Sequence, residues 1–122
     1  MAASEAPIAS VRWRPWRIPF RDEFRTSATG FRRREGILIE LRDRDGLTGL
    51  GEASPLPEYA GGSVEAVAVA LAAGVATLIG QSPTDAALMP TAWKSDGASA
   101  AALRCGVETA CADLGGEQAS VA

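Results

Sequence analysis

The spacing of apolar residues changes once along this chain, close to residue 60, and this change most constrains the fold. From Ile8 to Ala53 apolar and polar residues tend to alternate, which is the period of strands with one buried face. From Ser63 onward apolar residues recur every three or four positions, the period of an amphipathic helix. The order predicts an α+β fold, with a three-stranded antiparallel sheet followed by about three helices.

The first predicted strand runs from Ile8 to Phe20 and contains two prolines, Pro15 and Pro19. Each proline lacks the N–H that a sheet ladder needs, so we expect an edge strand or a strand interrupted by a bulge. Residues 22–30, which read DEFRTSATG, are small and polar, and they predict a loop.

The second and third predicted strands are joined by Asp-Gly at positions 45–46, which is typical of a two-residue type I′ hairpin turn. Before the turn, residues 34–43 place isoleucines and a leucine on one face. After it, residues 47–53 carry two alternating glycines, Gly49 and Gly51. These glycines leave one face bare, so another backbone can approach closely there.

Three helices are predicted in the second half of the chain. The first begins with Ser63 as its N-cap and ends at Gly80. The second starts at Ser82-Pro83 and is stopped by Pro90, and the third covers residues 98–114 and ends at two glycines. The outward faces of the first and third helices are rich in alanine and almost uncharged, so we expect another surface to cover them.

Charge is divided unevenly along the chain. Residues 1–44 hold ten arginines against six acidic residues, a balance of +4, whereas residues 45–122 hold two basic residues against nine acidic ones, a balance of −7. The arginines alternate with apolar residues as on a solvated sheet face, so we expect no nucleic-acid partner. The first ten residues lack the apolar centre of a signal peptide, and residues 64–79 are too short and alanine-rich for a membrane span. We therefore expect a cytoplasmic protein without a membrane partner.

The residue types exclude several kinds of catalysis. The chain has no histidine, so a Ser-His-Asp triad is impossible. Cys105 and Cys111 lie six residues apart, so they point to different faces of a helix, and we expect free thiols rather than a metal site. No acidic residues have the spacing of metal ligands. The residue types alone thus identify no catalytic residue and no metal site, and leave the loops at 22–31 and 54–62 as places for ligand contact.

Five segments in a fixed order resemble the N-terminal capping domain of the enolase superfamily, in its muconate-lactonizing and mandelate racemase group. They are residues 18–30 (IPFRDEFRTSATG), 34–41 (REGILIEL), 45–46 (DG), 49–57 (GLGEASPLP) and 101–114 (AALRCGVETACADL). The resemblance extends over about residues 8–116. Within the superfamily, the GEASPLP run and the strand opened by REG are most similar to the o-succinylbenzoate synthases.

The resemblance implies part of a magnesium-dependent lyase, which dehydrates a cyclohexadiene carboxylate to o-succinylbenzoate in menaquinone biosynthesis. In the complete family enzyme a (β/α)₈ barrel holds Mg²⁺ through three acidic residues and carries two acid–base lysines. Neither lysine matches Lys94, the single lysine of this chain. The resemblance therefore carries over no catalytic residue, and we expect a truncated chain that is inactive alone and binds no Mg²⁺.

The resemblance also implies two lid loops that close over the barrel mouth and shape substrate preference. They match residues 25–30 and 54–59. The candidate substrate-binding residues, by this resemblance, are Ser27, Ala28 and Thr29 in the first loop and Pro55, Leu56 and Tyr59 in the second. Small residues in the first loop would leave room for a substrate tail, and apolar residues in the second would form a wall. The expected partners are the barrel and a small carboxylate substrate.

The expected organisation is an unstructured N-terminus over 1–7, a capping domain over 8–97, a helix leading to the barrel over 98–116 and a tail over 117–122. Other functions stay open. The chain is also compatible with the cap of a dipeptide epimerase, an N-succinylamino acid racemase or a muconate cycloisomerase. An alternative of another class is a stand-alone, non-catalytic module that self-associates through its helix faces.

Overall fold

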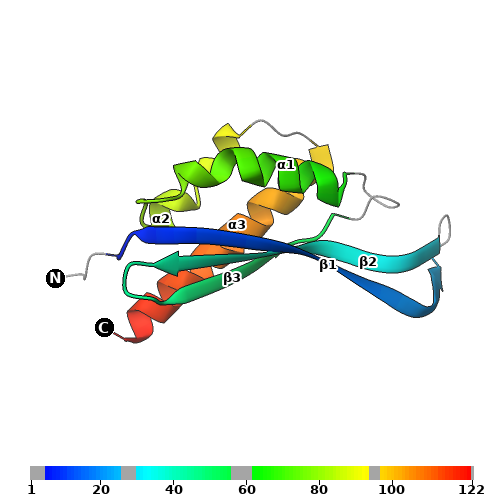
Figure 1. The fold of residues 1–122 in the computed structure, drawn as a ribbon, viewed down its shortest axis with the longest axis horizontal. Helices are drawn as coiled ribbons and strands as arrows, with labels where there is room; N and C mark the ends of the chain where they lie inside the picture. Colours follow the sequence, from blue (N-terminus) through cyan, green and yellow to red (C-terminus); the bar gives the residue numbers. More distant parts are fainter. Residues whose placement is uncertain (1–4, 26–29, 56–61, 94–96, 122) are drawn as a thin grey trace.

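The computed structural model describes residues 5–25, 30–55, 62–93 and 97–121, with the backbone alone for residues 19–25 and 30–33. The strands are β1 (Ile8–Arg25), β2 (Gly30–Asp43) and β3 (Thr48–Ala53). The helices are α1 (Val64–Gly74), α2 (Pro83–Ala86) and α3 (Gly97–Ser120), with two short 3₁₀ segments, η1 (Val75–Thr77) and η2 (Met89–Ala92). The helices lie on one face of the sheet (Figure 1). This arrangement confirms the predicted α+β fold.

The sheet is antiparallel with the strand order β1-β2-β3, so β1 lies at an edge, as its prolines predict. Its pairing with β2 is irregular at two places, next to Ile8 and after Pro19. Pro15 is paired with Ile37, where its missing N–H falls on the outer edge of the sheet. The expectation of an interrupted edge strand is therefore confirmed.

The loop predicted over residues 22–30 is too long. The structure continues β1 to Arg25 and begins β2 at Gly30, with Phe24 paired with Phe31. Cross-strand pairing in this hairpin overrides the weak strand propensity of the small polar residues.

The turn between β2 and β3 is a three-residue loop rather than the predicted two-residue type I′ turn. The Asp43 N–H donates to the Leu47 carbonyl (2.9 Å), and the Gly46 N–H donates to the Asp43 carbonyl (3.2 Å). Gly46 has a φ of 89°, whereas Asp45 lacks the positive φ that a type I′ turn requires. The Asp43 carboxylate fixes this conformation, because its Oδ1 accepts from the N–H groups of Asp45 (2.8 Å) and Leu47 (2.9 Å).

The helix starts follow the predicted caps. Ser63 Oγ accepts from the Ala66 N–H (3.0 Å) at the start of α1. Ser82 Oγ accepts from the Asp85 N–H (3.1 Å) at the start of α2. Among the helices of the described residues, none combines the length and apolar character needed to cross a membrane.

The end of α1 differs from the prediction. The backbone tightens into η1 at Val75 and then turns at Gly80, which has a φ of 86°. A 3₁₀ segment has three residues per turn, so positions beyond it leave the face set by the α-helical period. Leu78 remains buried, whereas Ile79, the next residue, is 45% exposed.

α3 is longer than predicted, because it continues through Gly115-Gly116. In this added part, Gln118 Nε2 donates to the Ala6 carbonyl (3.0 Å) and to Asp43 Oδ2 (2.9 Å). These bonds tie the last turns of the helix to the N-terminal segment and to the β2–β3 turn, which offsets the low helix propensity of the glycines. The stretch 117–120, predicted as part of a tail, is therefore helical.

Residues 5–7 are held in place, in contrast to the unstructured N-terminus predicted over 1–7. The Glu5 carboxylate accepts from the N–H (3.3 Å) and the Oγ1 (2.9 Å) of Thr84. The Pro7 carbonyl accepts from the Arg44 N–H (3.2 Å). This segment therefore connects α2 to the β2–β3 turn.

The core lies between the helices and the inner face of the sheet, by which we mean the face that the helices cover. All three strands and the helical layer contribute to it, and its fully buried residues in β2, α1 and α3 include Ile37, Ile39, Leu41, Val67, Leu71, Leu103, Val107 and Leu114. Leu103, Val107 and Leu114 form one apolar stripe along α3, and apolar burial fixes α1 and α3 to the central strand.

The backbones of β3 and α3 approach each other closely at two glycines. A Cβ added to Gly51 would lie 2.0 Å from the Gly106 carbonyl oxygen, and one added to Gly49 would lie 2.3 Å from another carbonyl oxygen of α3. Asp113 Oδ2 accepts from the Leu50 N–H (2.8 Å), so the helix also covers the outer edge of β3. The close approach predicted at the two strand glycines is confirmed.

Candidate functional site

The β1–β2 hairpin extends beyond the rest of the sheet. β3 ends where Ala53 is paired with Ile37, but β1 and β2 stay paired as far as Arg25 and Gly30. The part of β2 beyond β3, residues 30–36, corresponds to about 24 Å of strand. In Figure 1 this hairpin runs past the helices, and both chain termini lie at the opposite end. We call residues 16–25 and 30–36 the overhang.

The inner face of the sheet changes from apolar to charged where the overhang begins. Pro15 opposite Ile37 is the last apolar pair on this face, and the next pair is Arg17 opposite Glu35. Arg17 Nε lies 3.5 Å from Glu35 Oε2, with the two side chains 61% and 24% exposed. A charged pair on the face that would otherwise join the core marks the point where helix packing ends.

The second predicted loop leaves β3 beside the base of the overhang. The Trp16 ring lies over Gly36, where an added Cβ would be 2.8 Å from the ring and 2.6 Å from Ser54 Oγ. Ser54 Oγ in turn donates a hydrogen bond to Glu52 Oε1. The start of the second loop and the base of the overhang therefore form one continuous surface.

The other end of the second loop is held by the first turn of α3. The Ser63 N–H donates to Ser99 Oγ (3.0 Å). Gly62 has a φ of 84°, and an added Cβ there would lie 2.8 Å from the Ser99 nitrogen. Ser99 is buried, so this contact fixes where the loop rejoins the helical layer.

The structure places one of the six candidate substrate-binding residues. Pro55, two residues after the end of β3, is buried. The other five lie outside the described residues: Ser27, Ala28, Thr29, Leu56 and Tyr59. The described flanks nevertheless bring the starts of both loops to the same end of the sheet.

Sequence reasoning does not predict two residues that position these loops, Trp16 and Ser99. A signal exists for Trp16, because a glycine in the neighbouring strand, Gly36, leaves the space that its ring occupies. Ser99 gives a weaker signal, since a serine in the first turn of a helix usually serves its own helix. Here it bonds a residue 36 positions earlier instead.

The described residues offer no site for a metal ion. No group of three histidine, cysteine, aspartate or glutamate side chains within these ranges is arranged to hold one. Mg²⁺ needs several oxygen ligands, so the described part of this chain does not fit it.

The two cysteines are free, with Cys105 exposed and Cys111 buried, which confirms that they lie on different faces of the helix. Burial, with smaller contributions from Glu108 and Glu5, raises the pKa of Cys111 to about 11. A buried thiol that stays protonated at neutral pH is a poor nucleophile. Cys111 is therefore a core residue rather than a reactive one.

Several solved structures share this fold. A dipeptide epimerase from Enterococcus faecalis V583, solved with Mg and the dipeptide L-Leu-L-Tyr, matches with a TM-score of 0.79 at 20% identity. A muconate lactonizing enzyme from Pseudomonas fluorescens, solved with muconolactone, matches with 0.79 at 23% identity. A mandelate racemase/muconate lactonizing protein from Herpetosiphon aurantiacus matches with 0.73, also at 23% identity. The fold is thus that of the N-terminal capping domain of the enolase superfamily.

The sequence match identifies the family more closely. The family model described as MenC, N-terminal domain, matches residues 10–104, which is most of the chain. The chain belongs to the MenC N-terminal domain family. Among curated proteins, none matches this chain.

The three structures are much longer than this chain. The matches cover 93%, 93% and 89% of this chain, but only 32%, 32% and 30% of the respective structures. This chain therefore spans about a third of the length of the enzymes whose fold it shares.

Proposed function

We propose that this chain is the lid and specificity part of an o-succinylbenzoate synthase-type enzyme, acting together with a (β/α)₈ barrel that performs the chemistry. The match to the MenC N-terminal domain over residues 10–104 carries this proposal. The complete enzyme dehydrates a cyclohexadiene carboxylate to o-succinylbenzoate in menaquinone biosynthesis, in the cytoplasm. In the complete enzyme the barrel, rather than this chain, would hold Mg²⁺, and the ion would supply charge stabilisation at the substrate carboxylate.

The geometry of the overhang supports a lid. A two-stranded hairpin that passes the helices has little core of its own, and its length lets it contact a second domain. The second loop starts beside the base of this hairpin and returns to Ser99. In the proposed enzyme the two loops contact the non-reacting end of the substrate. The barrel holds the reacting end, so substrate preference and chemistry reside in different parts.

The candidate residues of the two loops differ in size, and they suit different contacts with the substrate. Ser27, Ala28 and Thr29 are small and leave space for the substrate tail, while Leu56 and Tyr59 supply an apolar wall. Pro55, at the start of the second loop, is buried. Such contacts affect the rate by orienting the substrate, because binding energy at a remote end of the substrate helps to place its reacting carbon.

The test joins this chain to the barrel of a family member and compares three reactions: dehydration to o-succinylbenzoate, dipeptide epimerisation and muconate cycloisomerisation. The control is the same barrel with its own capping domain. We expect this chain to raise the kcat/KM of dehydration relative to the other two reactions by about tenfold or more. An unchanged ratio of the three kcat/KM values would show that this chain does not determine substrate preference.

A second candidate is the cap of a dipeptide epimerase, which the match to the Enterococcus faecalis enzyme favours. In that case the wall of the second loop would contact a dipeptide side chain. The same experiment separates the two candidates, since a selective rise in epimerisation would support the second and contradict the first.

A further inference from the structure

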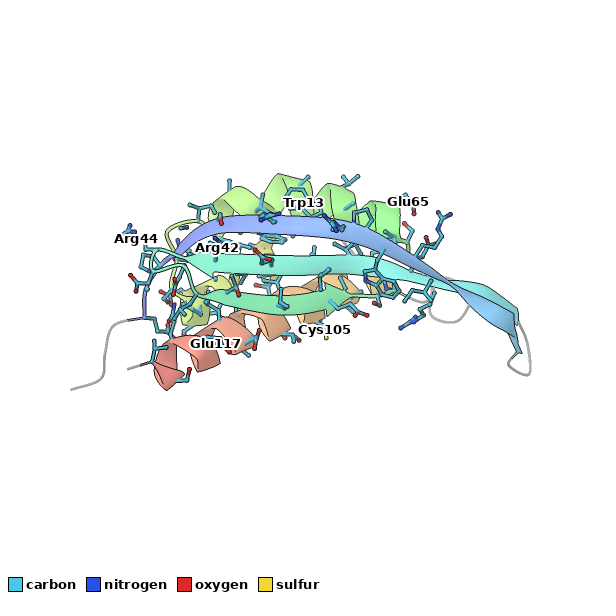
Figure 2. The ribbon with its side chains drawn as sticks, turned by 60° about the horizontal axis from the view of Figure 1, so that its bottom comes forward. Trp13, Arg42, Arg44, Glu65, Cys105 and Glu117 are labelled. Atoms are coloured by element: carbon cyan, nitrogen blue, oxygen red, sulfur yellow. The ribbon has the colours of Figure 1, made fainter. Side chains whose placement is uncertain are left out.

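The outer face of the sheet, opposite the helices, carries an ordered pattern of charges. Figure 2 shows the sheet in front of the helices, with Arg42 labelled on it. The pairing register arranges the side chains of this face in rows across the three strands. Two rows matter here: Arg12, Glu40 and Leu50, and then Arg14, Leu38 and Glu52. Leu38 and Leu50 are 41% and 45% exposed, so this face leaves apolar surface in solvent.

The charges of the first row are paired within one chain. Glu40 Oε1 lies 3.9 Å from Arg12 Nη1 and 4.0 Å from Arg42 Nη2. In the second row Arg14 makes no ion pair with any described residue. Its counterpart Glu52 stands two strands away, about 10 Å across the sheet, and the two form no ion pair within one copy.

The second row is complementary to a copy of itself. Across the sheet this row consists of a cation, Arg14, then Leu38, then an anion, Glu52. A two-fold axis parallel to β2, placed between two facing outer surfaces, keeps the rows aligned and reverses the strand order. Arg14 of each copy then faces Glu52 of the other, and the two Leu38 side chains meet between them. Both charges gain a partner in this arrangement.

We propose that the outer face of the sheet docks with a second copy of this chain through the row Arg14–Leu38–Glu52. Leu50 then packs against the aliphatic stem of Arg12 from the second copy. The two Glu40 carboxylates approach one another, and each keeps its arginine partners. Three strands give a face about 14 Å wide, so this interface is at the small end of specific interfaces and the dimer is weak.

The outer face of α1 is a rival surface for self-association. Val69 on this helix is 72% exposed, and its neighbours are mostly alanine. Nothing on that face fixes an orientation, whereas the charges of the sheet face do, and charge complementarity is what selects a partner and its register. The sheet face is therefore the surface to test, with α1 as the control.

The test is analytical ultracentrifugation of this chain from about 20 µM to about 1 mM, a range suited to a weak dimer. We expect Arg14→Glu and Glu52→Arg each to weaken association about tenfold or more, because each places like charges face to face. An equimolar mixture of the two variants restores it, since the introduced glutamate of one variant then faces the introduced arginine of the other. The unchanged Glu52 and Arg14 also face each other in that mixed dimer. The control Val69→Glu associates as the parent chain does.

Circular dichroism checks that each variant is folded. If a charge-reversed variant does not fold, the single variants Arg14→Ala and Glu52→Ala are measured in its place. The alanine variants are each expected to weaken association. The proposal is overturned by a parent chain that stays monomeric up to about 1 mM. It is equally overturned if the mixture of charge-reversed variants fails to associate, or if Val69→Glu abolishes association while Arg14→Glu leaves it unchanged.

Discussion

The two ends of the sheet differ in what holds them. At the covered end, β1, β2 and β3 pack on α1 and α3, and every inner-facing residue of β2 from Ile37 to Leu41 is fully buried. In the overhang the same face carries the Arg17–Glu35 pair, and no helix lies over it (Figure 1). The covered end owes its stability to apolar burial, whereas the backbone of the overhang is held by the pairing of β1 with β2.

This difference separates stability from function. Substitutions at the covered end change packing, so they act on the free energy of unfolding. Substitutions in the loops carried by the overhang leave that packing intact, so they can change substrate preference at little cost in stability. The predictions below test this separation.

The largest effect is expected where β3 meets α3. Gly51→Ala places a Cβ 2.0 Å from the Gly106 carbonyl oxygen, so strand and helix must move apart. We expect a loss of about 3 kcal/mol or more in the free energy of unfolding, measured by urea titration. The matched control is Gly116→Ala, where no atom lies within 4 Å of the added Cβ. That change should stabilise α3 by about 0.5–1 kcal/mol, and equal effects of both would contradict the packing account.

A smaller loss is expected at the β2–β3 turn. Asp43 is buried and accepts from two backbone N–H groups and from Gln118. Asp43→Ala leaves these donors without their acceptor and should lower the free energy of unfolding by about 1–3 kcal/mol. Asp45→Ala, at an exposed position in the same turn, should change it by less than about 0.5 kcal/mol.

Substitutions in the lid loops should change the kinetics of the fused enzyme and leave the free energy of unfolding nearly unchanged. In this chain joined to a family barrel, Ala28→Phe fills the space proposed for the substrate tail. We expect kcat/KM to fall about 10–200-fold, with a smaller fall in kcat than the rise in KM. Ala72→Phe makes the same change at an exposed site on α1 and should leave the kinetics unchanged. If both variants behave alike, residue 28 does not contact the substrate.

The smallest effect is a pH dependence from Cys111. Its pKa is raised from 9.0 to about 11, so the folded state holds the thiol proton more tightly than the unfolded state. This contribution to stability is complete below pH 9 and is lost as the pH rises toward 11. Unfolding at pH 10 should therefore require about 1 kcal/mol less than at pH 8. Cys111→Ala should remove this difference, and Cys105→Ser, at an exposed thiol, should keep it.

The covered end could be predicted from the sequence because its apolar period, caps and glycines all follow from local chemistry. Ser63 and Ser82 cap their helices as expected, and Gly49 and Gly51 admit a second backbone. The predicted turn type was wrong because the Asp43 side chain reshapes the loop.

Other errors arise from contacts between distant segments. The extension of α3 depends on Gln118 reaching Ala6 and Asp43, which no local pattern signals. The anchoring of the second loop by Ser99 has the same origin. The sequence could predict that the candidate site lies in the two loops between secondary-structure elements. The five candidates at positions 27–29, 56 and 59 remain predictions.

The most direct test of the account shortens the overhang. Residues 19–33 are replaced by Asn-Gly, which closes a two-residue turn between Ile18 and Arg34, a directly opposed pair. We expect the free energy of unfolding of the shortened chain to stay within about 1 kcal/mol of the parent. When it is joined to a family barrel, kcat/KM should fall by about 100-fold or more, because the lid is gone. A shortened chain that unfolds, or one whose fused enzyme keeps its kcat/KM, would contradict the division between a stabilising end and a functional end.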